Sequence, residues 1–205
     1  MATDSQPRRR DARLDGFIVV AAMVALMWVV EVVDEIDNHR LDTWGIRPHH
    51  FDRLIGIITA PFLHAGFGHL SANTVPFVVL GFAIAFSGVR QVLAVTGIVM
   101  VIGGLGTWLI APSNTVHIGA SGVVFGYATY LVFRGVFTGK VAELLLGAAV
   151  AAIWGSALLS GLAPHDGISW QGHLCGAIGG IAAAALLNGR EGRKPKAPNA
   201  VPDGL

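Results

Sequence analysis

The sequence predicts an all-α polytopic membrane protein with six transmembrane helices. Of its 205 residues, 53% are hydrophobic and only 13% are charged, whereas a soluble domain carries about 25% charged residues. The mean hydropathy of +0.62 agrees with this class. Between Arg53 and Arg90, and again between Arg90 and Arg134, the chain carries no charge. Such stretches are long enough to hold helices that cross the hydrocarbon core of a bilayer.

The first predicted helix covers Phe17–Val33, which is apolar except for Glu31 near its end. It follows the basic segment 1–16. A cleaved signal peptide is the competing interpretation. The apolar run is too long for one, and acidic residues rather than a small-residue cleavage site follow it. We therefore expect a membrane-spanning helix.

The next segment, Asp34–Phe67, is long and of mixed composition. Its apolar part, Leu54–Phe62, is too short to span a bilayer, so we expect it to lie in the interface or to re-enter the membrane. Irregular backbone at that depth must be covered by protein or line a wet cavity.

Five further helices follow, separated by turn residues such as those of Ala111–Thr115 and by the loop Gly161–Gly167. They are expected at His69–Phe86, Gln91–Ile110, Gly119–Phe133, Val141–Leu159 and Ile168–Leu187. Residues 17–188 thus form one membrane domain. The polar, basic tail 189–205 is expected to be disordered.

The distribution of basic residues orients these six helices. With the N-terminus in the cytoplasm, the inner segments hold eleven of the fourteen Lys and Arg residues and the outer segments hold three. This asymmetry follows the positive-inside rule and places both termini in the cytoplasm. The short N-terminal segment shows no Ser/Arg-rich transit peptide, which favours a bacterial plasma membrane.

Four polar residues are predicted to lie at one shallow depth below the outer face. His69 and Asn73 belong to the second helix, Ser121 to the first turn of the fourth, and His173 to the sixth. Polar groups inside a bilayer need partners or a function. An imidazole can take the proton of a serine hydroxyl and make it a nucleophile. His69 and Asn73, spaced i, i+4, can offer two donors to an oxyanion, together with the backbone N–H of Ser121.

Each of these residues also has a structural interpretation. A membrane serine is most often a packing residue, and histidine or asparagine often bonds across helices. The combination on three helices at one depth favours acyl-transfer chemistry.

Small residues allow these helices to approach closely. Gly119, Gly122 and Gly126 are predicted to share a face of the fourth helix, and Gly176 and Gly180 form GxxxG on the face of the sixth helix that carries His173. Phe125, four residues after Ser121, is placed either to stack on the His173 ring or to face lipid or the core.

Taken together, these residues resemble the rhomboid proteases. The motifs are His69-Leu-Ser-Ala-Asn73, Gly119-Ala-Ser121-Gly122 and Gly172-His173-Leu-Cys-Gly176-Ala-Ile-Gly-Gly180, in the order, spacing and host helices of that family. The resemblance covers roughly residues 17–187. It implies a six-helix rhomboid-like bundle and a Ser121–His173 dyad without an acid. It also implies an oxyanion site from His69, Asn73 and Ser121, and no cofactor or metal.

The resemblance further implies cleavage of transmembrane segments of other proteins. His64 matches a second loop histidine often seen in the family, whereas the tryptophan–arginine pair of the first loop is not evident and Phe125 stands where some members have tyrosine. Asp166 is not expected to complete a triad, because the family works without one.

Two other functions are weighed against a protease. A catalytically silent relative would bind transmembrane clients without cutting them, and loss of the serine or histidine would be its signature. A transporter would carry polar residues through the full bilayer depth, whereas the inner halves of the second, fourth and sixth helices are almost purely apolar. The expected partners are therefore the lipid bilayer and transmembrane substrates, with no nucleic acid. The single Cys175 lies in an apolar run, so no disulfide or Cys/His metal site is expected.

Overall fold

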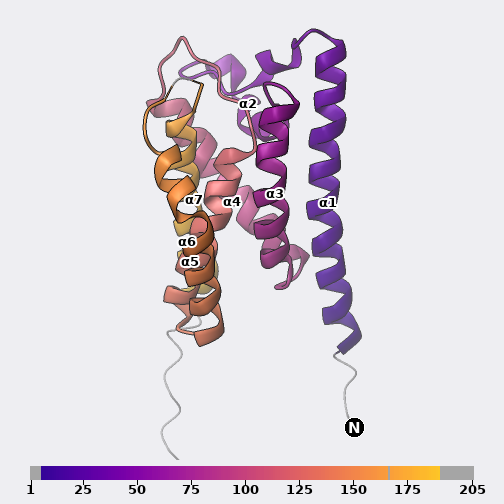
Figure 1. Ribbon diagram of the computed structural model, residues 1–205, viewed down its shortest axis with the longest axis vertical. Helices are drawn as coiled ribbons and strands as arrows, with labels where there is room; N and C mark the ends of the chain where they lie inside the picture. Colours follow the sequence, from indigo (N-terminus) through magenta and orange to yellow (C-terminus); the bar gives the residue numbers. More distant parts are fainter. Residues whose placement is uncertain (1–5, 166, 190–205) are drawn as a thin grey trace, which may run out of the picture.

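The computed structural model describes residues 6–165 and 167–189, and every regular element in that part of the chain is helical. The six long helices are α1 (Gln6–Ile36), α3 (Phe67–Ala85), α4 (Val89–Ile110), α5 (Ser121–Thr138), α6 (Val141–Gly161) and α7 (Trp170–Asn188). They run alternately up and down, so that the beginning of α1 and the end of α7 lie at the same end of the bundle (Figure 1). The predicted all-α bundle is confirmed.

Five of these helices are long and apolar enough to cross a membrane among the residues described: α1 from Asp11 onward, α3, α4, α6 and α7. Helix α5 is the exception, because it carries Tyr127, Thr129, Tyr130 and Arg134. Half of its residues are buried, and it contacts α3, α4, α6 and α7. A helix surrounded by other helices can be less apolar than its neighbours, since protein rather than lipid surrounds its side chains.

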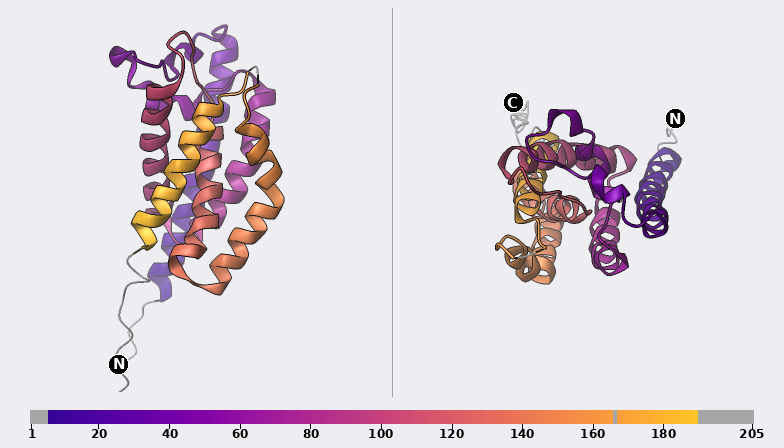
Figure 2. Two further views of the ribbon diagram at one scale, coloured as in Figure 1. Left: turned by 90° about the vertical axis from the view of Figure 1, so that its left-hand side faces the viewer. Right: turned by 90° about the horizontal axis from the view of Figure 1, so that it is seen from above.

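The first helix extends further than the sequence predicts. It begins at Gln6, inside the basic segment, and ends at Ile36. It stands at one side of the bundle and packs mainly on α3 (Figure 2). The predicted tail 189–205 lies outside the described residues from position 190 on.

The long connection between α1 and α3 contains short turns instead of a spanning helix, as the short apolar part Leu54–Phe62 predicts. These are the 3₁₀ turns Leu41–Trp44, Phe51–Arg53 and Ala60–Phe62 and the one-turn helix α2 (Gly56–Thr59). The connection is tied to the residues that precede α5. Ile46 and His117 form an antiparallel bridge, and the N–H of Gly119 donates to the carbonyl of Ala60 at 2.9 Å. This segment therefore fixes where α5 begins.

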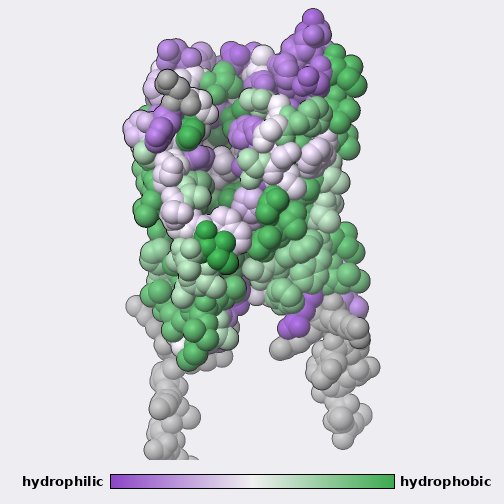
Figure 3. Space-filling view, in the orientation of Figure 1, coloured by the Kyte–Doolittle hydropathy of each residue, from purple (hydrophilic) through white to green (hydrophobic). Residues whose placement is uncertain are grey.

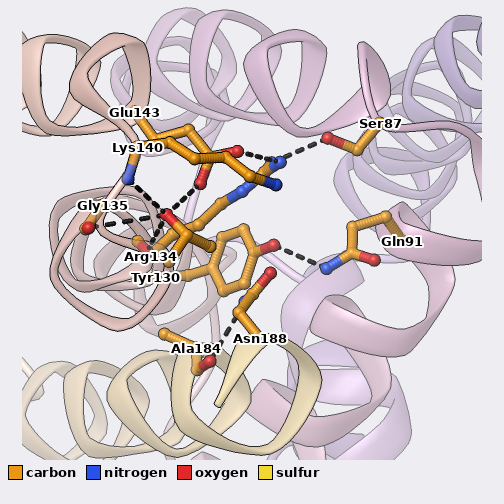
Figure 4. A network of polar contacts seen from close by, with 10 residues as sticks. Ser87, Gln91, Tyr130, Arg134, Gly135, Lys140, Glu143, Ala184 and Asn188 are labelled. Carbon is orange, nitrogen blue, oxygen red and sulfur yellow. Dashed lines mark hydrogen bonds and ion pairs between the residues drawn. The ribbon is translucent and has the colours of Figure 1, made fainter. Parts of the chain in front are cut away.

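At the end of the bundle opposite to this connection, a polar network joins α5 to α4, to α6 and to the end of α3 (Figure 4). Arg134 on α5 makes an ion pair with Glu143 on α6 at 2.8 Å and donates to Ser87 Oγ, after α3, at 2.7 Å. Gln91 of α4 donates to the Tyr130 hydroxyl at 2.6 Å. Mostly buried, hydrogen-bonded charges are costly to separate, so this network fixes the start of α6 against α5.

Candidate active site

Ser121 and His173 meet where α5 and α7 begin. Ser121 Oγ lies 2.8 Å from His173 Nε2. Ser121 is the first residue of α5 and His173 the fourth of α7, two residues nearer the helix start than predicted because α7 begins at Trp170 rather than Ile168. As the first residue of its helix, Ser121 has a backbone N–H without an intrahelical acceptor. The pair is thus set at the N-terminal ends of two helices that point the same way.

Glycines allow this close approach of α5 and α7, which share the most extensive contact of any two helices. A Cβ built on Gly176 would overlap the carbonyl oxygen of Gly122, and one on Gly180 would overlap the carbonyl oxygen of Gly126. Thr129 Oγ1 also donates across the interface to the carbonyl of Ala177 at 2.9 Å. Any larger residue at these positions would push the serine away from the histidine.

Gly119 does not lie on the glycine face of α5, and the structure corrects that prediction. It precedes the helix with a φ of +110°, a conformation that favours glycine. A Cβ there would lie 2.9 Å from His69 Nε2 and 3.6 Å from Asn73 Nδ2. Its missing side chain therefore leaves room for two donors beside Ser121.

His69 and Asn73 present these donors on one face of α3. The amide nitrogen Nδ2 of Asn73 is buried and has no hydrogen-bond partner among the described residues. Ala65 N–H approaches His69 Nδ1 at 3.5 Å, which leaves Nε2 as the nitrogen facing Gly119. A buried donor without a partner is costly in a finished fold. The Asn73 amide is therefore suited to an acceptor that a bound molecule brings.

The His173 ring is held on several sides. Phe125 stacks on it with ring centroids 4.2 Å apart and an interplanar angle of 11°, which is the first of the two placements that the sequence allows. Its Nδ1 lies 2.8 Å from the carbonyl oxygen of Gly161, at the end of α6. Asp166, the acid considered from the sequence, lies outside the described residues.

His64 supports the start of α5 from the connecting segment. Its side chain is fully buried, and its Nε2 accepts the N–H of Ala120 at 3.2 Å. Burial, followed by the neighbouring His69, lowers the pKa of His64 to about 4. His64 is therefore neutral near pH 7, as an acceptor of an N–H must be.

A second supporting pair, His117 and Ser169, was not found by the sequence analysis. His117 Nδ1 lies 2.6 Å from Ser169 Oγ, which in turn accepts the N–H of Gly172 as the N-cap of α7. Burial lowers the pKa of His117. The available signals were a histidine four residues before Ser121 and a serine just before the sixth helix. The pair joins the start of α7 to the loop before α5.

One cavity of about 730 Å³ lies between these helices, and His69, Asn73, Ser121 and His173 all line it. Trp154, Ala157 and Leu158 of α6 close its other side. The face shown in Figure 3 is hollowed between α3 and α6, and paler and hydrophilic residues surround the hollow within a largely hydrophobic surface. A serine hydroxyl, an imidazole and the donors of His69 and Asn73 thus line one cavity.

Comparison with known proteins finds similar sequences over most of the chain. Residues 52–190 match the family model of the Rhomboid domain. An uncharacterized protein of Mycobacterium bovis, Mb1372, is 41% identical over 201 residues, which cover 94% of this chain and 83% of that protein. The putative rhomboid protease YdcA of Bacillus subtilis is 27% identical over 86% of this chain and 92% of its own length. The chloroplastic rhomboid-like protein 11 of Arabidopsis thaliana is 33% identical over 74% of this chain and 60% of its own length.

Proposed function

Because this chain belongs to the rhomboid family of integral membrane proteins, we propose that it is an intramembrane serine endopeptidase that cleaves transmembrane segments of other membrane proteins. The observation that carries this proposal is the 2.8 Å contact between Ser121 Oγ and His173 Nε2 at the wall of a large cavity. No cofactor is needed for this chemistry, since serine and histidine suffice for acyl transfer.

In the proposed reaction, Ser121 Oγ attacks the carbonyl carbon of the scissile peptide while His173 Nε2 takes the hydroxyl proton. The tetrahedral intermediate carries an oxyanion. The donors available to it are His69 Nε2–H, Asn73 Nδ2–H and the backbone N–H of Ser121. His173 then gives its proton to the departing amine, which leaves an acyl-enzyme on Ser121. Water, deprotonated by His173, hydrolyses the ester and restores the hydroxyl.

The proposal includes the orientation of the bundle. The basic residues favour an orientation with both termini in the cytoplasm of a bacterial cell and with the starts of α3, α5 and α7 toward the outside. Reporter fusions after residue 205 and within residues 111–118 test this orientation. A reporter after residue 205 that is active only outside the cell would contradict it.

Labelling with a serine-directed phosphonate probe tests the chemistry. The purified wild-type chain should be labelled at Ser121, and Ser121→Ala and His173→Ala should lose both labelling and cleavage, by about 10⁴-fold or more. Ser156→Ala is the matched control, because Ser156 is an exposed serine of α6. If the wild type takes no label and cleaves no substrate although it is folded, the catalytically silent alternative holds.

A further inference from the structure

A group of acidic side chains lies at the outer end of α1, away from the residues of the proposed dyad. Asp34, His39 and Asp42 each offer one ligand atom, and these atoms lie within 4.8 Å of one another. Glu31, one helical turn before Asp34, adds a third carboxylate that interacts electrostatically with both aspartates. Figure 3 shows hydrophilic residues gathered where α1 ends at the top of the molecule.

The backbone at the end of α1 brings this group together. Asn38 and His39 both have positive φ, +55° and +59°, and the N–H of His39 donates to the carbonyl of Asp34 at 2.9 Å. The chain therefore turns back on the helix end. Its next turn, Leu41–Trp44, carries Asp42, and Asp34 Oδ1 accepts the N–H of Leu41 at 2.7 Å. The four side chains come from one reversal of the chain.

Two of the carboxylates are buried without a Lys or Arg partner among the described residues. Glu31 is 0% exposed and Asp34 1% exposed. Among the described residues, the oxygens of Glu31, Asp34 Oδ2 and Asp42 Oδ1 accept no well-formed hydrogen bond, although the Gly66 backbone lies beside Glu31 and His39 Nδ1 lies 3.5 Å from Asp34 Oδ2. Within the described residues no Lys or Arg makes an ion pair with Glu31, Asp34 or Asp42. The nearby Arg40 pairs with Asp37. Buried carboxylates are normally paired, protonated or bound to a metal.

The histidine is arranged as metal-bound histidines usually are. His39 Nδ1 lies 3.5 Å from Asp34 Oδ2, on the side of the cluster, and Nε2 lies 3.5 Å from Glu35 Oε2. A ligating imidazole almost always turns its second nitrogen to a carboxylate or carbonyl, which fixes its tautomer. Glu35 is in that place.

We propose that Asp34, His39 and Asp42 bind one divalent cation of the Zn²⁺ or Mn²⁺ class, with Glu31 as a further carboxylate beside it. One imidazole with two carboxylates is a mixed nitrogen and oxygen set, which suits these cations better than Ca²⁺ or Mg²⁺. Ligand bonds of roughly 2.0–2.2 Å require the donors to come somewhat closer than 4.8 Å. The side chain of His39 is 48% exposed and free to make that movement.

The cation would neutralise the buried carboxylates and join α1 to the connecting segment. Glu31 also lies beside the backbone of Gly66, which precedes α3. The site therefore stabilises the outer end of α1 against the helix that carries His69 and Asn73. Regular Cys and His spacings in the sequence indicate no metal site. Asp34, His39 and Asp42 do not follow such a spacing, because a reversal of the chain brings them together.

The test uses the full chain without a histidine tag, stripped with a chelator and then passed over a desalting column after exposure to each cation. Elemental analysis should find one Zn²⁺ or Mn²⁺ per wild-type chain, and the melting temperature should rise with either cation. His39→Ala and Asp42→Asn should weaken binding about tenfold or more. His50→Ala and Asp37→Asn are the matched controls, since both change half-exposed side chains of the same region outside the cluster and should bind as the wild type does.

Two results would overturn the proposal. One is a wild-type chain that retains neither cation, or only Ca²⁺ or Mg²⁺. The other is equal retention by wild type, His39→Ala and Asp42→Asn, which would place the cation at other histidines. His39→Ala alters a half-exposed side chain, so its loss of binding can be measured in folded protein even if Asp42→Asn is unstable.

Discussion

His173 Nδ1 lies 2.8 Å from the backbone carbonyl oxygen of Gly161, the last residue of α6. A carbonyl can only accept a hydrogen bond, so Nδ1 must carry the proton of the neutral imidazole. Nε2 is then the nitrogen with the free lone pair, and it is the one that faces Ser121. The end of α6 thus fixes the tautomer and orientation of this histidine, which is one part of what the aspartate does in a serine protease triad. The position of α6 and the tautomer of the base are linked.

The first prediction concerns Gly161. In Gly161→Ala, the added methyl would lie 2.6 Å from Phe125 Cζ and 3.0 Å from His173 Nδ1, so the ring must move away from its carbonyl partner. We expect kcat to fall roughly 10²-fold, the size of effect that a misplacement of about 1 Å produces. Gly155→Ala on the same helix meets nothing within 4 Å and should keep wild-type kcat. Equal kcat in the two variants would show that the carbonyl does not position the base.

The second prediction concerns Asn73, whose buried Nδ2 lacks a partner. If this amide donates to the oxyanion, Asn73→Ala should lower kcat by about 10²–10³-fold with little change in KM. Its melting temperature should not fall, because no hydrogen bond of the resting protein from Nδ2 is lost. Ser71→Ala, at an exposed position of the same helix, serves as the control. A stability loss with unchanged kcat would make Asn73 a structural residue.

The third prediction concerns the contact between α5 and α7. In Gly180→Leu the side chain would collide with the carbonyl of Gly126 and with Thr129, so α7 must shift and separate His173 from Ser121. We expect loss of phosphonate labelling, with Gly176→Leu behaving in the same way. Gly97→Leu on α4 has open space around it and should label normally. Normal labelling of Gly180→Leu would contradict the role given to this glycine face.

The sequence predicts the helices of the site well because apolar length and turn residues determine them. The expected His69–Phe86 corresponds to Phe67–Ala85, and the similar depth of Ser121 and His173 follows from the directions of their helices, while their 2.8 Å contact also needs the glycines between α5 and α7. The Gly161 carbonyl is different. Every residue has a carbonyl, so no residue type marks the one that contacts the histidine.

Local backbone conformation explains the other differences. The sequence predicts that a helix begins at Gly119, whereas this residue has a φ of +110° and belongs to the loop before α5. The reversal at Asn38 and His39 likewise depends on two positive φ angles that residue type only weakly favours. The contacts of Gly119 and His39 depend on these backbone angles, so they could not be predicted from the sequence.

The fourth prediction concerns pH and His64. Its pKa is about 4 in the folded protein because of burial and the nearby His69, against 6.5 ordinarily. Between these values the unfolded chain binds more protons than the folded one, so stability is lost as the pH falls from 6.5 to 4, by up to about 3 kcal/mol for this group. The melting temperature of wild type should fall over this range, and that of His64→Gln should fall less. His50→Gln, at an exposed histidine of the same segment, should follow wild type.

The last prediction concerns where a substrate is cut. The candidate residues lie in the first two turns of α3, α5 and α7, all at one end of the bundle, which is the outer end in the proposed orientation. Carbonyls within a substrate helix are already hydrogen-bonded, so the helix must unwind locally before Ser121 can attack. Small or helix-weakening residues make this unwinding easier. The scissile bond should therefore lie in the outer part of the substrate's membrane segment or just beyond it, beside a small residue.

Entry of such a segment requires α6 to move at its outer end. Trp154 and Leu158 in the second half of α6 border the cavity, whereas the Arg134–Glu143 ion pair holds the start of α6 against α5. Mass spectrometry of the products from a reconstituted transmembrane substrate locates the cut. Moving a single glycine along the substrate helix should change cleavage only while the glycine lies in the outer half. A cut reproducibly at the cytoplasmic end would contradict either the orientation or the assignment of Ser121, and the reporter fusions would show which of the two is wrong.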